Sequence, residues 1–304
     1  MKKIIMVGMG AIGTTFAAQM KDSGLSPLVL SDSARKARYT QEGFTVNGKS
    51  YDFEYILPTE KHLTADFIFV AVKYHDLPAI REDLKPFMGA HTVLVSLMNG
   101  IDSEEILGET LGREGIVHAY VMQIDAVREG QSVTYSQPGQ IVYGRANGQE
   151  DEAMTALKSL FNQTIINHLP VNNILERLWF KFLINVGLNQ VSAILDAPYG
   201  VFQRFDMAYE LVKDAMREVI AISRAKGIPL EESVMDDFKE IMDTLDPKAM
   251  TSMHQDVRAQ RKTEVEMLAG KVIDLGRKYD IPTPVNDTLF KMLKTLEYQY
   301  TLNQ

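Results

Sequence analysis

The chain has 304 residues, 45% of them hydrophobic and 24% charged, which is enough for two ordinary domains with buried cores. A net charge of -8 and a pI of about 5.4 argue against nucleic acid or an anionic membrane as a partner of the whole surface. The absence of cysteine excludes disulfides, thiolate metal sites and cysteine nucleophiles. Apolar runs such as 4–7 are too short for a signal peptide or a membrane span, so we expect a cytoplasmic protein.

Short β-rich runs alternate with helical stretches in the first half of the chain. The pattern predicts strands at 4–7, 28–30, 67–72 and 92–96, and helices at 11–21, 34–41 and 77–87. These strands are continuous and apolar, as in parallel sheets that are buried on both faces. The alternation therefore predicts right-handed βαβ units and a doubly wound parallel sheet, an α/β fold of the Rossmann type.

The pattern is less regular after Gly100. Strands are expected at 116–122, 132–136 and 140–143, followed by a helix at 152–161 and a strand at 164–168. The strands at 132–136 and 140–143 flank a Gln-Pro-Gly turn and could form a hairpin. We place the boundary near Pro170, which gives a Rossmann dinucleotide-binding domain at 1–170 and a second domain at 171–304.

The second domain shows long helical periodicity and few strand signals. Helices are expected at 174–195, 207–226, 231–245, 254–279 and 286–300, with a proline shortly after two of their ends. The sequence therefore predicts an all-helical domain after the Rossmann-type domain.

Three glycines mark a dinucleotide site directly after the first strand. Gly8, Gly10 and Gly13 form G-x-G-x-x-G, in which the first permits the turn, the second admits a pyrophosphate and the third lets helix and strand pack closely. The anion would lie on the N–H groups where the helix begins, at Ala11 and Ile12. The alternative is a plain glycine-rich turn.

Asp32 follows the second strand, 19 residues after Gly13, where an acid can accept a hydrogen bond from the 2′-hydroxyl of an adenine ribose. An acid at this position favours NAD, because it would repel the 2′-phosphate of NADP. The basic residues that follow, Arg35, Lys36 and Arg38, could instead hold that phosphate. Alternatively, Asp32 caps the next helix and the basic residues form a solvated face.

Polar residues also follow two later strands, Lys73 after "FVAV" and Asn99 after "LVSLM". Ligands bind at this carboxyl edge in open parallel sheets. Either residue could instead cap a turn.

The helix expected at 174–195 carries a polar stripe on an otherwise apolar surface. Lys181, Asn185 and Asn189 recur every four residues, which places a cation and two amides on one face. Because the other faces are apolar, we expect this stripe to face a cleft, the alternative being solvent. The pattern Ser252, Asp256, Gln260, Glu264 predicts a second polar helix face, from which Glu264 could pair with Lys181 across the interdomain cleft or be one more surface acid.

At these residues the sequence resembles the ketopantoate reductase (2-dehydropantoate 2-reductase) family over almost its whole length. The resemblance rests on "VGMGAIG", "VAVK", "MNGI", "WFKFLINVGLN" and "TSMHQDVRAQRKTEVEMLAG", in that order. It implies a Rossmann domain followed by a helical domain, and hydride transfer from NADPH to 2-dehydropantoate, giving pantoate for pantothenate and coenzyme A synthesis.

The resemblance also implies roles for the polar residues. Lys181 would protonate the ketone oxygen, and Glu264 would orient the substrate and the lysine. Asn99 would hold the ribose or nicotinamide end of the cofactor, with Lys73 beside it. The substrate's hydroxyl and carboxylate ends would be bound by Asn185, Asn189 and Ser252.

Two positions depart from the family pattern. Many members have arginine, which contacts the NADP 2′-phosphate, where this chain has Asp32, so NAD is the alternative to NADP. Asp196 stands where an asparagine is common near the substrate. Together these departures favour an NAD-dependent D-2-hydroxyacid dehydrogenase of the same family as the alternative function.

A further alternative is a non-catalytic dinucleotide-binding sensor, which would need the glycine turn but not the Lys181 stripe. The histidine spacing gives no metal site. The expected partner is a small 2-keto acid, with neither nucleic acid nor a membrane, and the apolar helices are compatible with a homodimer.

Overall fold

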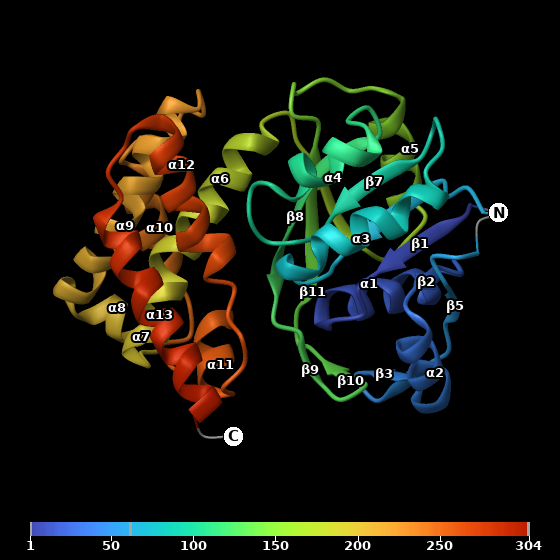
Figure 1. Ribbon diagram of the computed structural model, residues 1–304, viewed down its shortest axis with the longest axis horizontal. Coiled ribbons are helices and arrows are strands. Elements are labelled where there is room, and N and C mark those ends of the chain that lie inside the picture. The colour runs from blue at the N-terminus through green and yellow to red at the C-terminus, as the bar shows by residue number, and fades with distance from the viewer. Residues whose placement is uncertain (1, 61–62, 303–304) are drawn as a thin grey trace. The chain divides into compact units, whose positions relative to one another are not determined.

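The computed structural model describes residues 2–60 and 63–302. The chain divides into two compact units, Met1–Leu175 and Glu176–Gln304. The predicted boundary at Pro170 falls at the end of the last strand of the first unit. The first unit contains the strands of both sheets, and the regular elements among the described residues of the second are all helices, so the predicted fold class is confirmed (Figure 1).

The main sheet of the first unit has eight strands in its described residues, in the order β12-β11-β8-β7-β6-β1-β2-β5. The strands are β1 (Ile4–Val7), β2 (Leu28–Leu30), β5 (Glu54–Ile56), β6 (Phe67–Val70), β7 (Val93–Ser96), β8 (Ile116–Ile124), β11 (Pro138–Gly144) and β12 (Asn167–Pro170). The neighbouring strands pair in parallel, except for β8 and β11, which run antiparallel. The sheet is thus mixed, and its six strands from β8 to β5 in this order are all parallel.

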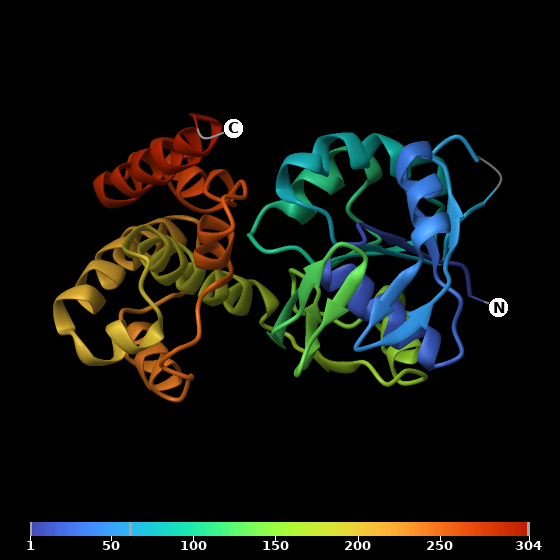
Figure 2. The same cartoon turned by 90° about the horizontal axis from the view of Figure 1, so that it is seen from below.

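Helices cover both faces of this sheet (Figures 1 and 2). Alternate residues of β1 belong to two separate apolar clusters, Ile4 and Met6 to one, Ile5 and Val7 to the other. The first cluster includes residues of α1 (Ala11–Asp22) and α5 (Glu152–Phe161), and the second includes residues of α3 (Leu77–Leu84) and α4 (Ser103–Leu111). Each fully buried Val, Ile or Leu stabilises the fold by about 1.5–3 kcal/mol, which explains the continuous apolar strands.

A second, four-stranded sheet has the order β4-β3-β10-β9. Its strands are β3 (Phe44–Val46), β4 (Lys49–Tyr51), β9 (Val127–Glu129) and β10 (Ser132–Thr134). The predicted hairpin between the strands at 132–136 and 140–143 is wrong, because β10 pairs with β9 and β3 while β11 pairs with β8 and β12. The actual hairpin turns at Gly130, whose φ of 59° suits a glycine.

Arg128 ties this small sheet to the glycine turn. Its Nε donates to Gly130 O at 2.7 Å and its Nη2 donates to Gln131 Oε1 at 2.7 Å. Its Nη1 donates to the carbonyl of Met9, which also accepts the Thr14 hydroxyl at 3.2 Å.

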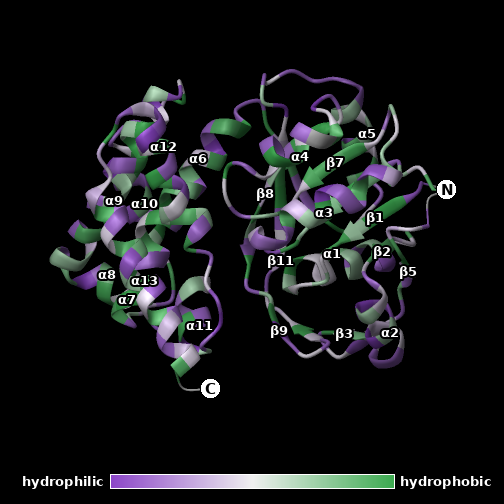
Figure 3. Cartoon of the chain, in the orientation of Figure 1, coloured by the Kyte–Doolittle hydropathy of each residue, from purple (hydrophilic) through white to green (hydrophobic). Residues whose placement is uncertain are grey.

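The helical unit has α9 (Asp206–Ala225) at its centre. The buried residues Val212, Ala215, Met216 and Val219 follow the helical repeat along one side of it. Against α9 pack α12 (Lys271–Tyr279), α13 (Pro284–Leu302) and a π-helical segment, η3 (Asn185–Asn189). The helices of this unit show alternating apolar and polar bands (Figure 3). Its remaining helices are α6 (Ile174–Ile184), α7 (Gln190–Leu195), α8 (Tyr199–Arg204), α10 (Val234–Asp243), α11 (Ser252–Arg258) and the π-helical η4 (Glu266–Gly270).

The helix predicted at 254–279 is broken. Helix α11 ends at Arg258, Gln260 adopts a left-handed conformation with φ 51°, and helical structure resumes at η4. Glu297 of α13 accepts hydrogen bonds from Thr263 N at 2.8 Å and Thr263 Oγ1 at 2.6 Å, which holds the non-helical segment between α11 and η4 against α13. The predicted polar face running from Ser252 to Glu264 therefore does not lie on one helix.

The run α6, η3 and α7 is long and apolar enough by composition to cross a membrane. Most of its best apolar window, 61%, is buried inside the protein, as in the core helix of a globular unit.

Candidate active site

The glycine turn follows β1, and the chain itself requires two of its three glycines. A Cβ at Gly8, whose φ is 91°, would lie 2.5 Å from Ala71 O, and one at Gly13 would lie 1.9 Å from Gly8 O. At Gly10 the nearest atom would be 4.0 Å away, so nothing in the chain demands a glycine there. Gly10 is also the N-cap of α1 and provides no side-chain cap, which leaves the first N–H groups of the helix to an anion. The turn therefore fits a bound pyrophosphate.

Asp32 is the N-cap of α2 (Ser33–Glu42), as the helix-cap alternative predicted. Its Oδ1 accepts Arg35 N at 2.7 Å, and its Oδ2 lies 3.6 Å from Arg35 Nε. The other basic residues also have partners, since Lys36 pairs with Glu60 at 3.4 Å and Arg38 lies over the Tyr39 ring. The carboxylate is 55% exposed, so capping leaves it accessible, and its role in cofactor binding stays a prediction.

Lys73 and Asn99 follow β6 and β7. Lys73 is exposed and directly precedes a short 3-10 helix, η1 (Tyr74–Asp76), and Asn99 lies in the loop between β7 and α4. Because β7, β6 and β1 are parallel neighbours, both loops share the carboxyl edge with the glycine turn. The structure brings these three segments to one edge, where a dinucleotide could contact them.

A buried polar cluster that the sequence analysis missed holds the Asn99 loop. Ser103 Oγ lies 2.7 Å from Ser96 Oγ and donates to Glu104 Oε2 at 2.8 Å, while Tyr74 OH donates to Asp102 Oδ2 at 2.8 Å. Burial raises the pKa of Glu104 to about 7. No local motif marks this cluster, because acidic residues such as Glu104 are common in the first turn of a helix.

The predicted stripe of Lys181, Asn185 and Asn189 runs from α6 into η3. All three side chains are half-buried, and Asn189 Nδ2 donates to Asn185 Oδ1 at 3.4 Å. In a π-helix the hydrogen bonds run from i to i+5, so the turn is wider than in an α-helix. Gly187 lets this wide turn approach α9, since a Cβ there would lie 2.7 Å from Met216 Cγ.

Lys181 and Glu264 both belong to the helical unit, so the predicted pair does not join the two domains. Burial lowers the pKa of Lys181 to about 8, and the negative charge of Glu264 opposes that shift. Glu264 is half-buried just before η4, and its carbonyl accepts Met267 N at 3.0 Å. Because η4 packs against η3, the acid and the stripe are held by neighbouring π-helices.

Asp196, at the end of α7, contacts α11, and Ser252 is the first residue of α11, which packs against α7 and η3. Asp196 ends α7 with φ 49°, and its carboxylate accepts Arg258 Nε at 2.6 Å and lies 2.5 Å from His254 Nε2. These partners hold its pKa well below the usual range. Ser252 is exposed at the start of α11. Ser252 is therefore accessible, whereas Asp196 already serves a structural ion pair, and binding of substrate by either stays a prediction.

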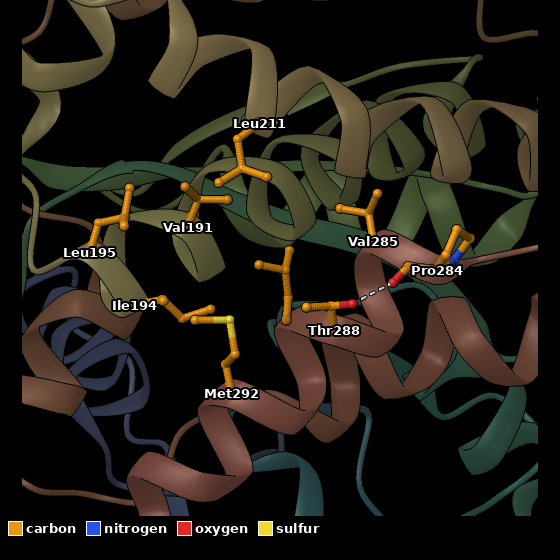
Figure 4. A pocket seen from close by; sticks show the side chains of 9 residues that line it. Val191, Ile194, Leu195, Leu211, Pro284, Val285, Thr288 and Met292 are labelled. Atoms are coloured by element: carbon orange, nitrogen blue, oxygen red, sulfur yellow. Dashed lines mark hydrogen bonds between the residues drawn. The ribbon is translucent and has the colours of Figure 1, made fainter.

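A separate pocket of about 390 Å³ lies between α7, α9 and α13 (Figure 4). Its lining is apolar apart from Thr288, whose hydroxyl donates to Pro284 O at 2.9 Å. It offers no acid, base or cation for hydride or proton transfer. Across residues 2–60 and 63–302, no group of three or more metal-ligating side chains occurs.

Comparison with known proteins gives matches over both units. The ketopantoate reductase PanE/ApbA family model matches residues 4–148, and the model of its C-terminal region matches residues 173–297. The 2-dehydropantoate 2-reductase of Streptococcus pyogenes serotype M3 is 26% identical over 92% of this chain and 93% of its own. That of Aquifex aeolicus is 26% identical over 97% of both chains.

Solved structures show the same fold. A D-mandelate dehydrogenase with NADH and anilino(oxo)acetate superposes with a TM-score of 0.89, at 23% identity and 99% coverage of both chains. A PanE/ApbA family ketopantoate reductase from Ralstonia eutropha JMP134 has a TM-score of 0.84, at 23% identity, 99% coverage of this chain and 100% of its own. The chain therefore belongs to the ketopantoate reductase PanE/ApbA family of NAD(P)-dependent oxidoreductases.

Proposed function

We propose that this enzyme reduces 2-dehydropantoate to pantoate with NADPH, in the synthesis of pantothenate and coenzyme A. The observation that carries the proposal is the half-buried Lys181, whose pKa is lowered to about 8 beside Glu264 and which shares a stripe with Asn185 and Asn189. A cation with this pKa is still protonated at neutral pH and gives up its proton readily, as a general acid requires.

The nicotinamide cofactor supplies the hydride that adds to the carbonyl carbon of the keto acid. Lys181 hydrogen-bonds the carbonyl oxygen, stabilises the negative charge that develops there and transfers its proton to it, which completes the 2-hydroxy acid. Solvent then returns a proton to the lysine. Glu264 favours the charged form of Lys181 before each turnover. Asn185 and Asn189 offer amide donors for the substrate's carboxylate and hydroxyl.

The glycine turn and α1 would hold the pyrophosphate, and the exposed basic side chains of α2 would meet the 2′-phosphate of NADPH. Arg35 is 50% exposed, and it would have to break its exposed ion pair with Asp32 to bind the phosphate. Such exposed pairs contribute little to stability. Supporting the fit, Gly10 has open space beside it that the chain itself does not use.

Asp32 favours a second candidate function, an NADH-dependent 2-hydroxyacid dehydrogenase. Its exposed carboxylate follows β2, where it would accept a hydrogen bond from a ribose hydroxyl and repel a phosphate. The D-mandelate dehydrogenase of the same fold was solved with NADH.

A substrate panel tests these proposals. Purified enzyme is mixed with 2-dehydropantoate and with branched and aromatic 2-keto acids, each with NADPH and with NADH, and cofactor oxidation is followed by absorbance. The highest kcat/KM with 2-dehydropantoate and NADPH supports the first candidate, and the highest with another keto acid and NADH supports the second. Cofactor binding without turnover of any keto acid would contradict both and indicate a sensor.

A further inference from the structure

The π-helix η3 has an anchor that lies outside the polar stripe. Gln190, the first residue of α7, is fully buried, and its Nε2 donates to the carbonyl of Val186 at 2.7 Å. A segment with i to i+5 bonds holds one more residue than an α-helical turn, which leaves a carbonyl open to another donor. The amide of Gln190 supplies such a donor from inside the core.

Gln190 is held in turn by a second buried amide. Its Nε2 also donates to Asn286 Oδ1 at 3.2 Å, and Asn286 Nδ2 donates to Ala215 O at 3.2 Å and to Glu218 Oε2 at 2.7 Å. Glu218 further accepts Val285 N at 2.8 Å and Asn286 N at 3.0 Å. The anchor therefore continues into α9 and the start of α13, through hydrogen bonds that a carboxylate strengthens.

Stability alone does not account for Gln190. Its Oε1 is buried and has no hydrogen-bond partner among the described residues, which is a cost that an apolar side chain would avoid. Only the Nε2 of this amide forms hydrogen bonds, and its Oε1 forms none among the described residues. The Nε2 touches the backbone between Asn185 and Asn189, the two amides of the stripe.

We propose that Gln190 is a positioning residue, which keeps η3 in its wide π-helical form and so holds Asn185 and Asn189 in register with Lys181. This inference rests on the proposed function for the role of the stripe. Without the amide, the turn relaxes toward i to i+4 bonding, in which each residue advances by about 100°, so that over eight residues Asn189 lies about 80° from Lys181 around the helix axis. The wider turn of η3 reduces that angle. Without it, Asn189 turns away from the line that joins it to Lys181.

The test compares Gln190→Leu with Gln203→Leu. Gln203 lies in the same unit, and its Nε2 also donates to backbone carbonyls, Met242 O at 2.8 Å and Leu245 O at 3.0 Å, but it has no bond to η3. We expect Gln190→Leu to raise KM for the keto acid and lower kcat by about tenfold each, with cofactor affinity unchanged. Gln203→Leu should lower the thermal midpoint and leave both constants as in the wild type.

Hydrogen exchange tests the anchor without relying on activity. Amide exchange in the peptide covering residues 184–191 should quicken at least tenfold in Gln190→Leu but not in Gln203→Leu. If Gln190→Leu does not fold, Gln190→Met fills the same volume with a flexible chain and should show the same two effects. Wild-type exchange, or faster exchange with unchanged KM and kcat, would overturn the inference. If wild-type enzyme reduces no keto acid, the proposed function fails, and the exchange result alone decides whether Gln190 holds η3.

Discussion

The glycine turn after β1 and the π-helix η3 are both irregular backbone segments in candidate binding regions, but different forces hold them. Steric exclusion holds the turn, because a Cβ at Gly8 or Gly13 would collide with neighbouring backbone. Gln190, the residue directly after η3, supports it from the core, and Gln190 is held in turn by Asn286 and Glu218, which are distant in sequence. A turn that requires glycines can be recognised from a short sequence motif. A segment that depends on partners remote in sequence shows no such motif.

Replacing the lysine of the helical unit should have the largest effect. Lys181→Ala removes the proposed proton donor, so kcat should fall by about a thousandfold, while cofactor affinity, which we assign to the first unit, should stay within about twofold. Stopped-flow turnover and fluorescence titration with NADPH measure the two quantities. Lys278→Ala, at an exposed site on α12, is the control. Near-normal turnover in Lys181→Ala would show that another group donates the proton.

The two kinds of glycine in the turn can be separated. Gly13→Ala forces α1 away from β1, so it should destabilise the protein by about 1–3 kcal/mol and weaken cofactor binding about a hundredfold. Gly10→Ala has room within the chain and should unfold like the wild type, yet bind cofactor about tenfold more weakly because the methyl group meets the pyrophosphate. Calorimetry measures both. Wild-type affinity in Gly10→Ala would remove that residue from the site.

The pH dependence tests the electrostatics of the helical unit. In the proposed mechanism Lys181 acts in its protonated form, and its pKa is lowered to about 8, so kcat/KM should hold below that pH and fall as the pH rises through it. Glu264→Gln removes the charge that favours the protonated form, so this decline should shift to lower pH by about one unit. Glu266→Gln, whose carboxylate contacts Lys294 at 2.7 Å, should leave the profile unchanged. An unshifted profile in Glu264→Gln would contradict the coupling.

The smallest effect is expected at Asp32. Asp32→Ser retains an N-cap but loses the charge, so the ratio of kcat/KM for NADPH to that for NADH should rise about tenfold at constant thermal midpoint. Asp32→Ala should lose the cap as well, at a cost of about 1 kcal/mol. An unchanged cofactor ratio in Asp32→Ser would mean that the residue is a cap and nothing more.

The sequence predicted the fold class because its strands are apolar runs and its helices carry regular apolar repeats. It also predicted the neighbourhood of Lys181 and Glu264. It failed where remote contacts override local pattern. Glu297 holds Thr263 and interrupts a helix whose periodicity continues past the break, and β10 pairs with strands remote from its expected hairpin partner. Helix α8 was missed because its six residues make fewer than two turns and show no full repeat. The sequence analysis also missed the nine-residue α4.

The bond from Arg128 to the carbonyl of Met9 links the small sheet to the donors of the glycine turn. A peptide group is planar and trans, so fixing the oxygen of Met9 on one side aims the N–H of Gly10 to the opposite side. Arg128 and Thr14 therefore set the direction of that N–H before any ligand arrives. A hairpin about 120 residues downstream, outside the main sheet, therefore orders the glycine turn in advance. This would reduce the conformational entropy that is lost when a ligand binds there.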